Sequence, residues 1–331
     1  MDDFAPVLIP TLNRHVHFRC CVESLSVCTH ADKTDLFIFL DYPLKDTHWE
    51  GYELIKAYLP NIKGFKTVNV IKREKNYGAV ENIIRALEYV FEKYDKMIFS
   101  EDDNVFSPNF LDYQNKCLDK FKDDKKVKVV CGYSCPIEIS GNFKYDYYYS
   151  KHQIAWGMGI WKNKKIFILD SERDKEIKKI NNYLQNPFKA YNLLFMPYYM
   201  LTGLIDIVKT GIFTDDRYIS FKNLTEGTYC VCPKLSLVRN HGHDGSGVHC
   251  GTIIQNPFVK QIIDTRTEFI FELHNDYENT QVKKAIKKYV MEFQYYNFRS
   301  KISLLKSYLL FIVKYDVLIK VAKWRFMKIL D

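Results

Sequence analysis

The chain has 331 residues, of which 47% are hydrophobic and 27% are charged, a globular composition with enough apolar material for one large or two moderate domains. The formal net charge of +8 favours an anionic partner, such as a nucleotide, a phosphorylated lipid or a membrane surface. The basic residues are spread along the chain, which argues against nucleic-acid binding, and nine cysteines without a repeated CxxC spacing argue against a zinc or disulfide framework.

The first half of the chain alternates between short apolar runs and segments with helical spacing. Strands are predicted at residues 5–12, 35–41, 65–73, 96–100 and 127–133. Helices are predicted at residues 17–28, 49–59 and 79–94, with a looser helical stretch near 172–208. Alternating strands and helices indicate βαβ units, so we expect an α/β fold with a mainly parallel central sheet that is covered by helices on both faces.

Polar residues follow three of the predicted strands. Thr11, Asn13 and Arg14 follow the first strand, Asp41 follows the second, and the triplet Glu101–Asp103 follows the fourth. Parallel sheets bind ligands beyond the carboxyl ends of their strands, so we expect these side chains to share one crevice. Clustered carboxylates suit Mg²⁺ or Mn²⁺, which would offset their repulsion and leave positions for a phosphate. The alternative is a solvated acidic turn that caps the next helix.

The segments IPTLNR, FLDYP, NYGAVENI and IFSEDDNVFSPNFLDY resemble the GT-A nucleotide-sugar glycosyltransferases. The likeness is greatest to the inverting branch that includes N-acetylglucosaminyltransferase I and related bacterial sugar transferases. TDDRYISF and CVCPKLSLVRNHGHDGSGVHCG follow in the order of that branch's catalytic and flexible-loop segments, so the resemblance covers about residues 5–255. It implies a Rossmann-like GT-A fold with a mixed sheet. It also implies a metal-dependent, inverting hexosyl- or N-acetylhexosaminyltransferase. The expected donor is a nucleotide-sugar, with a UDP-sugar as the first candidate.

The resemblance also implies roles for single residues. Asp41 would hydrogen-bond the nucleobase, and Asn82 would line the same pocket, where eukaryotic members have a histidine. Glu101 would face the donor sugar and Asp102 would lie near the ribose. Asp103 would be the metal ligand that bridges to the diphosphate. The remaining residues expected to bind the nucleotide-sugar are Thr11, Asn13, Arg14, Asn76 and His249.

An inverting transfer needs a carboxylate that removes the proton of the acceptor hydroxyl. Asp215 and Asp216 in FTDDRY match the family's base segment, and the choice between them stays open. The alternative is a loop turn or a helix cap.

The segment His241–Cys250 combines histidines with glycines, which permit close approach of the backbone to a diphosphate. His249 lies where the family contacts phosphate, so it would donate to the phosphate or join Asp103 as a metal ligand. His241 and His243 are further candidates for this role. A zinc site and a plain surface turn are the alternatives.

Two other segments point to the acceptor side and to a membrane. Trp156 and Trp161 in HQIAWGMGIWKNKKI are candidates for stacking on the acceptor sugar, and each fits the protein core equally well. Residues 299–330 are apolar at helical spacing with interspersed lysines, which predicts a basic amphipathic helix on a membrane surface. A pair of helices packed against the protein is the alternative.

We therefore expect a catalytic domain at residues 1–255, with a nucleotide-sugar-binding half (1–145) and an acceptor and flexible-loop half (146–255). A helical C-terminal extension would follow at residues 256–331. The expected acceptor is a glycan or lipid-linked glycan in bacterial surface polysaccharide assembly. We see no signal-peptide pattern, which predicts a cytoplasmic protein at the inner face of the cytoplasmic membrane.

Two other functions are considered. A nucleotidyltransferase would use the same crevice, but IPTLNRHVHF lacks the glycines of a phosphate-binding loop. A non-catalytic peripheral membrane protein that binds carbohydrate would use the aromatic residues and the basic tail alone.

Overall fold

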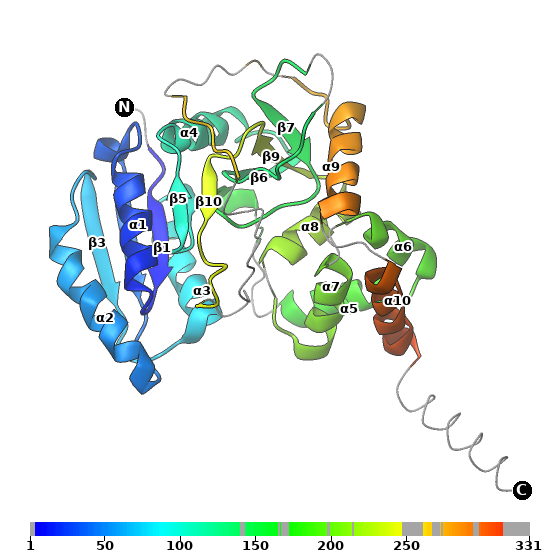
Figure 1. Cartoon of the computed structure of the whole chain (residues 1–331), viewed down its shortest axis with the longest axis horizontal. Helices are drawn as coiled ribbons and strands as arrows, with labels where there is room; N and C mark the ends of the chain where they lie inside the picture. Colours follow the sequence, from blue (N-terminus) through cyan, green and yellow to red (C-terminus); the bar gives the residue numbers. More distant parts are fainter. Residues whose placement is uncertain are drawn as a thin grey trace, which may run out of the picture. The chain divides into compact units, whose positions relative to one another are not determined.

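The computed structural model describes residues 4–139, 143–164, 166, 172–196, 199–213, 215–246, 261–266, 272, 274–293 and 298–313. The chain divides into two compact units (Figure 1). The first consists of residues 1–166 and 222–279, and the second consists of residues 167–221 and 280–331. Each unit is therefore assembled from two separate stretches of chain.

The first unit contains an eight-stranded sheet with the order β3-β2-β1-β4-β8-β6-β9-β7. Its strands are β1 (Val7–Thr11), β2 (Asp35–Leu40), β3 (Thr67–Lys72), β4 (Lys96–Phe99), β6 (Val127–Cys131), β7 (Tyr147–Ser150), β8 (Met158–Trp161) and β9 (Tyr229–Pro233). The pairs β1–β2, β2–β3, β1–β4 and β6–β9 are parallel, and β8 and β7 run antiparallel to their neighbours. The predicted α/β class with a mixed, mainly parallel sheet is confirmed.

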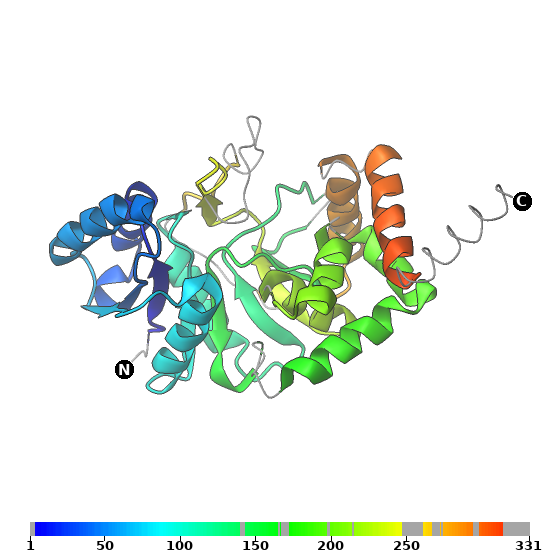
Figure 2. The same cartoon turned by 90° about the horizontal axis from the view of Figure 1, so that it is seen from below.

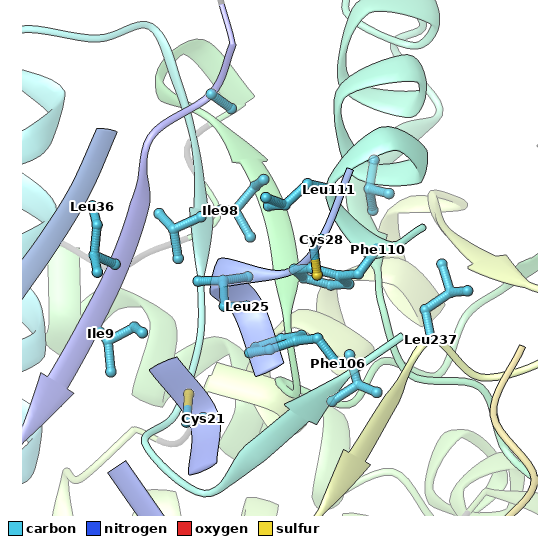
Figure 3. Close-up of a cluster of buried hydrophobic side chains, with 14 of the residues drawn as sticks. Ile9, Cys21, Leu25, Cys28, Leu36, Ile98, Phe106, Phe110, Leu111 and Leu237 are labelled. Atoms are coloured by element: carbon cyan, nitrogen blue, oxygen red, sulfur yellow. The ribbon is translucent and has the colours of Figure 1, made fainter. Parts of the chain in front are cut away.

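Helices pack on both faces of this sheet. The helices of the first unit are α1 (His15–Ser26), α2 (Asp46–Tyr58), α3 (Gly78–Phe91) and α4 (Phe110–Lys120), with short 3-10 turns at Ala31–Lys33, Leu59–Asn61 and Lys162–Lys164. On one face, Ile9, Leu36 and Ile98 are fully buried together with Leu25 of α1 and Leu111 of α4 (Figure 3).

The opposite face of the sheet packs against α3. Alternate residues of a strand point to opposite faces, so Phe37 and Phe39 of β2 lie away from α1. Their rings meet Tyr89 of α3 edge-on, with centroids 6.3 and 5.7 Å away. Because both faces are covered, β2 is buried along its whole length, which accounts for its unbroken apolar sequence.

A second, two-stranded sheet lies next to the end of β4. It pairs β5 (Asn104–Phe106) with β10 (Val238–Asn240) in antiparallel register, so that Asn240 lies opposite Asn104 (Figure 1). Phe106 and Leu237 are buried in the main core and anchor this sheet (Figure 3). The pairing brings His241, the first residue of the Gly/His segment (His241–Cys250), next to the acidic triplet Glu101–Asp103.

The described elements of the second unit are helical (Figure 2). They are α5 (Arg173–Leu184), α6 (Pro187–Tyr191), the 3-10 turn Asn192–Phe195, α7 (Tyr199–Thr210), α9 (Thr280–Phe293) and α10 (Phe298–Ile312). Helix α8 (Asp215–Glu226) begins in this unit and ends in the first. Among the helices that the structure describes, none combines the length and apolarity needed to cross a bilayer.

Candidate functional site

The acidic residues lie where the order of the sheet reverses. The chain runs from β1 outward to β2 and β3, then returns to β4 on the other side of β1. Parallel sheets bind ligands at this switch point, beyond the carboxyl ends of the two strands. Thr11 ends β1 and Arg14 precedes α1, while Asp102 and Asp103 follow β4. The sequence therefore placed these four residues at one edge of the sheet, and the structure brings them into contact.

Arg14 bridges the two aspartates. Its Nη1 donates to Oδ2 of Asp103 over 2.7 Å, and its Nη2 donates to Oδ1 of Asp102. Thr11 Oγ1 donates to the other oxygen of Asp102 over 2.8 Å. Both aspartates are buried, and the side chain of Arg14 is 22% exposed. The guanidinium is thus the direct counter-charge of a buried acidic pair.

The β10 end of the Gly/His segment covers Asp103. Asn240 Nδ2 donates to Oδ1 of Asp103 over 2.6 Å, and the backbone N–H of His241 donates to the Asp103 carbonyl over 2.9 Å. A Cβ at Gly242 would lie 2.0 Å from Oδ2 of Asp103, so this close approach requires glycine. Asn240 and Gly242 were not predicted as site residues; the signal was their place next to His241.

Burial and neighbouring charges shift the pKa values of these groups. The pKa values of Arg14 and Asp102 are raised, and those of His241 and His243 are lowered. Burial alone would lower the pKa of Arg14, but the attraction of Asp102 and Asp103 outweighs it and raises that pKa, so the guanidinium stays charged. Burial raises the pKa of Asp102 despite the attraction of Arg14. Burial also lowers the pKa values of His241 and His243, which favours their neutral forms near pH 7.

These residues do not fit a divalent ion in the arrangement observed. Each oxygen of Asp103 accepts a hydrogen bond from the protein, and one of the donors carries a positive charge. Within the described ranges, no group of three or more His, Cys, Asp or Glu side chains is arranged to hold a metal. The predicted partner His249 lies outside the described residues. Carboxylates suit Mn²⁺ or Mg²⁺ chemically, but here Arg14 takes the place of the ion.

Asp41 has a different environment at the end of β2. It is buried and accepts hydrogen bonds from the backbone N–H groups of Tyr42, Tyr77 and Gly78, each 2.9 Å long, and from Asn76 Nδ2 at 3.4 Å. A carboxylate offers about four acceptor positions, so these contacts saturate it. Asn76 also donates to the Tyr42 carbonyl over 2.5 Å. Asp41 therefore fixes the start of α3 against β2, and its predicted contact with a nucleobase stays a prediction.

Asn82 is buried in the same region and is engaged within the protein. Its Nδ2 donates to the Phe39 carbonyl over 3.2 Å, and its Oδ1 accepts from Arg73 Nε over 2.8 Å. Arg73 also lies over the rings of Phe39 and Tyr77, 5.0 and 5.3 Å from their centroids. Arg73 was not predicted; it is half-buried at the carboxyl end of β3 and adds a cation near Asp41.

The two tryptophans differ in accessibility. Trp161 of β8 is buried, and its indole N–H donates to the Leu118 carbonyl over 3.0 Å. This burial fits the alternative that Trp161 belongs to the protein core. Trp156 is partly buried and meets the rings of Tyr133 and His243 edge-on, at 4.7 and 5.6 Å. Trp156 therefore lies beside His243, and the acceptor role of either tryptophan stays a prediction.

Four further predicted residues lie on three different segments. Glu101 is half-buried between β4 and Asp102, and Asn13 lies between β1 and Arg14. Asp215 begins α8 in the second unit, and Asp216 Oδ1 there accepts from the backbone N–H of Arg217 over 2.8 Å. The role of either aspartate as a catalytic base stays a prediction.

No protein-family model and no curated protein matches the sequence. Among solved structures, the chain is similar to the mannosyltransferase PcManGT from Pyrobaculum calidifontis in complex with GDP-Man and Mn²⁺, with a TM-score of 0.34 and 12% identity over 48% of this chain and 44% of that one. It is also similar to S. aureus TarS, with a TM-score of 0.34 and 12% identity over 53% of this chain and 30% of that one. The chain thus covers less than half of either structure. These values are too low to assign an activity, which has to be inferred from the residues themselves.

Proposed function

We propose that the protein is an inverting glycosyltransferase that uses a nucleotide-sugar. The observation that carries the proposal is the cluster of Asp102, Asp103 and Arg14 at the switch point of the sheet. The mainly parallel sheet between helices agrees with a GT-A fold, and the segments IPTLNR, FLDYP and IFSEDD lie at the carboxyl ends of β1, β2 and β4.

In the proposed reaction, the acceptor hydroxyl attacks the anomeric carbon and the bond to the nucleoside diphosphate breaks. Asp215 or Asp216 is proposed as the base that takes the hydroxyl proton. The N–H groups of Arg14 that do not bond to Asp102 or Asp103 are available to the diphosphate, whose charge grows as it leaves. Glu101 is proposed to face the donor sugar, and Trp156 to stack on the acceptor.

The nucleotide is proposed to lie between the ends of β1 and β2. Asp41 shapes this pocket by holding Asn76 and the backbone of Tyr77 in place, and Asn82 supports it through Arg73. A UDP-sugar is the first donor to test, and a glycan or lipid-linked glycan of a bacterial surface polysaccharide is the proposed acceptor. Thr11 and Asn13 complete the proposed donor site.

A membrane contact through the C-terminal region is part of the proposal. Helix α10 exposes Ile302, Leu305, Leu309 and Leu310, each at least 45% accessible, next to Lys306. Apolar side chains beside basic residues suit the interface of an anionic bilayer. Deletion of residues after 298 is expected to abolish flotation with anionic liposomes and to leave nucleotide binding intact; unchanged flotation rules this contact out.

The proposed function is tested with a thermal-shift panel of UDP-, GDP-, CMP- and dTDP-sugars, with and without Mn²⁺. A true donor at 100 times its Kd stabilises the protein by about 2.7 kcal/mol. Release of the nucleoside diphosphate with an acceptor, and inverted stereochemistry of the product by NMR, complete the test. If none of these sugars stabilises the protein, glycosyl transfer is excluded. Stabilisation by a nucleoside triphosphate alone would instead favour a nucleotidyltransferase, and glycan binding that survives Asp103→Ala would favour a carbohydrate-binding protein.

A further inference from the structure

The strongest unexplained feature is that a side chain of the protein occupies the position expected for a metal ion. Arg14 contacts both carboxylates through different nitrogens, Nη1 with Asp103 and Nη2 with Asp102. Neighbouring carboxylates repel each other, and a guanidinium between them cancels much of that repulsion through charge-assisted hydrogen bonds. A divalent ion would perform the same electrostatic task at the same place.

Because the acidic pair is buried, it needs a compensating positive charge in direct contact. The side chains of Asp102 and Asp103 are each 7% exposed. A buried carboxylate without a partner is strongly unfavourable, whereas a paired one is tolerated. Thr11 and Asn240 also donate to the pair, but both side chains are neutral. The compensating positive charge in direct contact with both acids is that of Arg14.

The nearby histidines do not replace it. Nε2 of His17 lies 3.1 Å from Oδ2 of Asp244, so this imidazole is directed at another carboxylate. Burial, together with Arg239 and His17, lowers the pKa of His241, and burial lowers that of His243. Near pH 7 these two rings therefore add little positive charge to the acidic pair.

The space around Asp103 is closed as well. Oδ1 accepts from Asn240, and Oδ2 accepts from Arg14 and faces the α-carbon side of Gly242, where even a Cβ would lie 2.0 Å away. An ion that binds Oδ2 of Asp103 competes with the guanidinium for that oxygen, because two cations in contact with the same oxygen repel each other, and one that binds Oδ1 has to displace the Asn240 amide.

We propose that Arg14 is a built-in counter-ion that blocks the acidic pair, so that the protein without nucleotide has no divalent-ion site at Asp102 and Asp103. Loss of the charge at position 14 creates such a site. The proposal concerns the protein alone and is independent of which donor, if any, the protein uses.

The test measures binding of Mn²⁺ alone, without nucleotide, from the free-Mn²⁺ signal in electron paramagnetic resonance. Wild-type protein is expected to leave this signal unchanged. Arg14→Met, which keeps the length of the side chain and removes its charge, is expected to bind Mn²⁺ at least about tenfold more tightly, equivalent to a 1.4 kcal/mol difference. Arg14→Met combined with Asp103→Asn is expected to lose that gain. Arg19→Met, five residues further along the chain in helix α1 and paired with Glu23 at the surface, is the matched control and is expected to behave like wild type.

Two results overturn the proposal. One is an Arg14→Met protein that folds, as judged by circular dichroism, but binds Mn²⁺ no better than wild type. The other needs no Arg14 variant: tight Mn²⁺ binding by the wild-type protein that disappears in Asp103→Asn. Because neither measurement contains a nucleotide-sugar, failure of this proposal and failure of the proposed glycosyl transfer are distinguished.

Discussion

Buried carboxylates follow both β2 and β4, but the protein neutralises them in different ways. Asp41, after β2, accepts three backbone N–H groups and one side-chain amide. Asp102 and Asp103, after β4, are held by the side chains of Arg14, Thr11 and Asn240. Backbone donors are fixed by the fold, whereas a side chain can turn away without unfolding anything.

We predict that this difference separates a structural carboxylate, Asp41, from the carboxylates that act in the proposed reaction. The Asp41 contacts include Gly78, the first residue of α3, so removing them loosens the junction between a strand and a helix. The contacts of Asp103 can be exchanged for contacts with a ligand. Isosteric Asp→Asn changes at the two places should therefore affect different properties.

Asp103→Asn should lower kcat/KM for sugar transfer about 10²–10³-fold, the usual effect of removing one electrostatic group from an active site. The new NH₂ group would face Arg14 or Asn240, which are both donors. Its unfolding free energy should still fall less than that of Asp41→Asn, because these side chains can turn away whereas the backbone donors of Asp41 cannot. Steady-state release of nucleoside diphosphate and urea denaturation measure the two quantities. Full activity of this variant would place the acidic pair outside the chemistry.

Asp41→Asn should lower the unfolding free energy by about 2 kcal/mol, because its new NH₂ group faces backbone donors and leaves at least one of them without an acceptor. The midpoint of urea denaturation should fall with little change in its slope. If the variant is as stable as wild type but no longer binds nucleotide, Asp41 contacts the base directly and is not a purely structural carboxylate.

Gly242→Ala should cost about 1–3 kcal/mol, the range for overpacking a filled site. The added Cβ would meet Oδ2 of Asp103 at 2.0 Å. Gly203→Ala is a matched control, because its Cβ would meet the Arg217 side chain at 2.2 Å, which is flexible and can shift. Denaturation curves should rank Gly242→Ala as the less stable variant. The reverse ranking would show that the backbone around Gly242 shifts readily to make room for a Cβ.

The smallest effect concerns pH. Burial raises the pKa of Asp102 above its ordinary value of 3.8, so the folded protein binds this proton more tightly than the unfolded chain does. The stability from this group is present below the unfolded pKa and is lost as pH rises through the folded pKa. Asp102→Asn removes this dependence. The slopes of the unfolding free energy against pH for the variant and the wild type should differ by at most one proton, about 1.4 kcal/mol per pH unit. Urea midpoints measured at several pH values above 3.8 check this, and parallel curves contradict it.

The sequence was sufficient for β1, β2, β3, β4 and β6 and for which of them end in polar residues, because apolar runs and their boundaries are local features. It did not predict β7, β8 or β9 of the same sheet. It also placed Thr11, Arg14 and Asp103 at one edge of the sheet. It did not reveal that Arg14 bonds to the acids, because side-chain partners depend on the order of strands in space. The saturation of Asp41 was hidden for the same reason, since its donors are backbone groups that any sequence possesses.

Other features had no local signal. The three-residue strands β5 and β10 are too short for a recognisable pattern, yet they bring Asn240 to Asp103. Trp156 and Trp161 lie in the same aromatic segment, and only the packing of β8 shows which of them is buried. The discontinuous second unit likewise follows from contacts between distant segments.

Arg14 lies 88 and 89 positions from its two acidic partners, yet the charge of each is tolerable only in the presence of the other. An exchange at one of these positions is therefore harmful until a second exchange restores the balance. Natural variants of this chain should lose the arginine and an acid together, or keep both. Such correlated replacement would be recorded in related genes and could be recognised there without any structure.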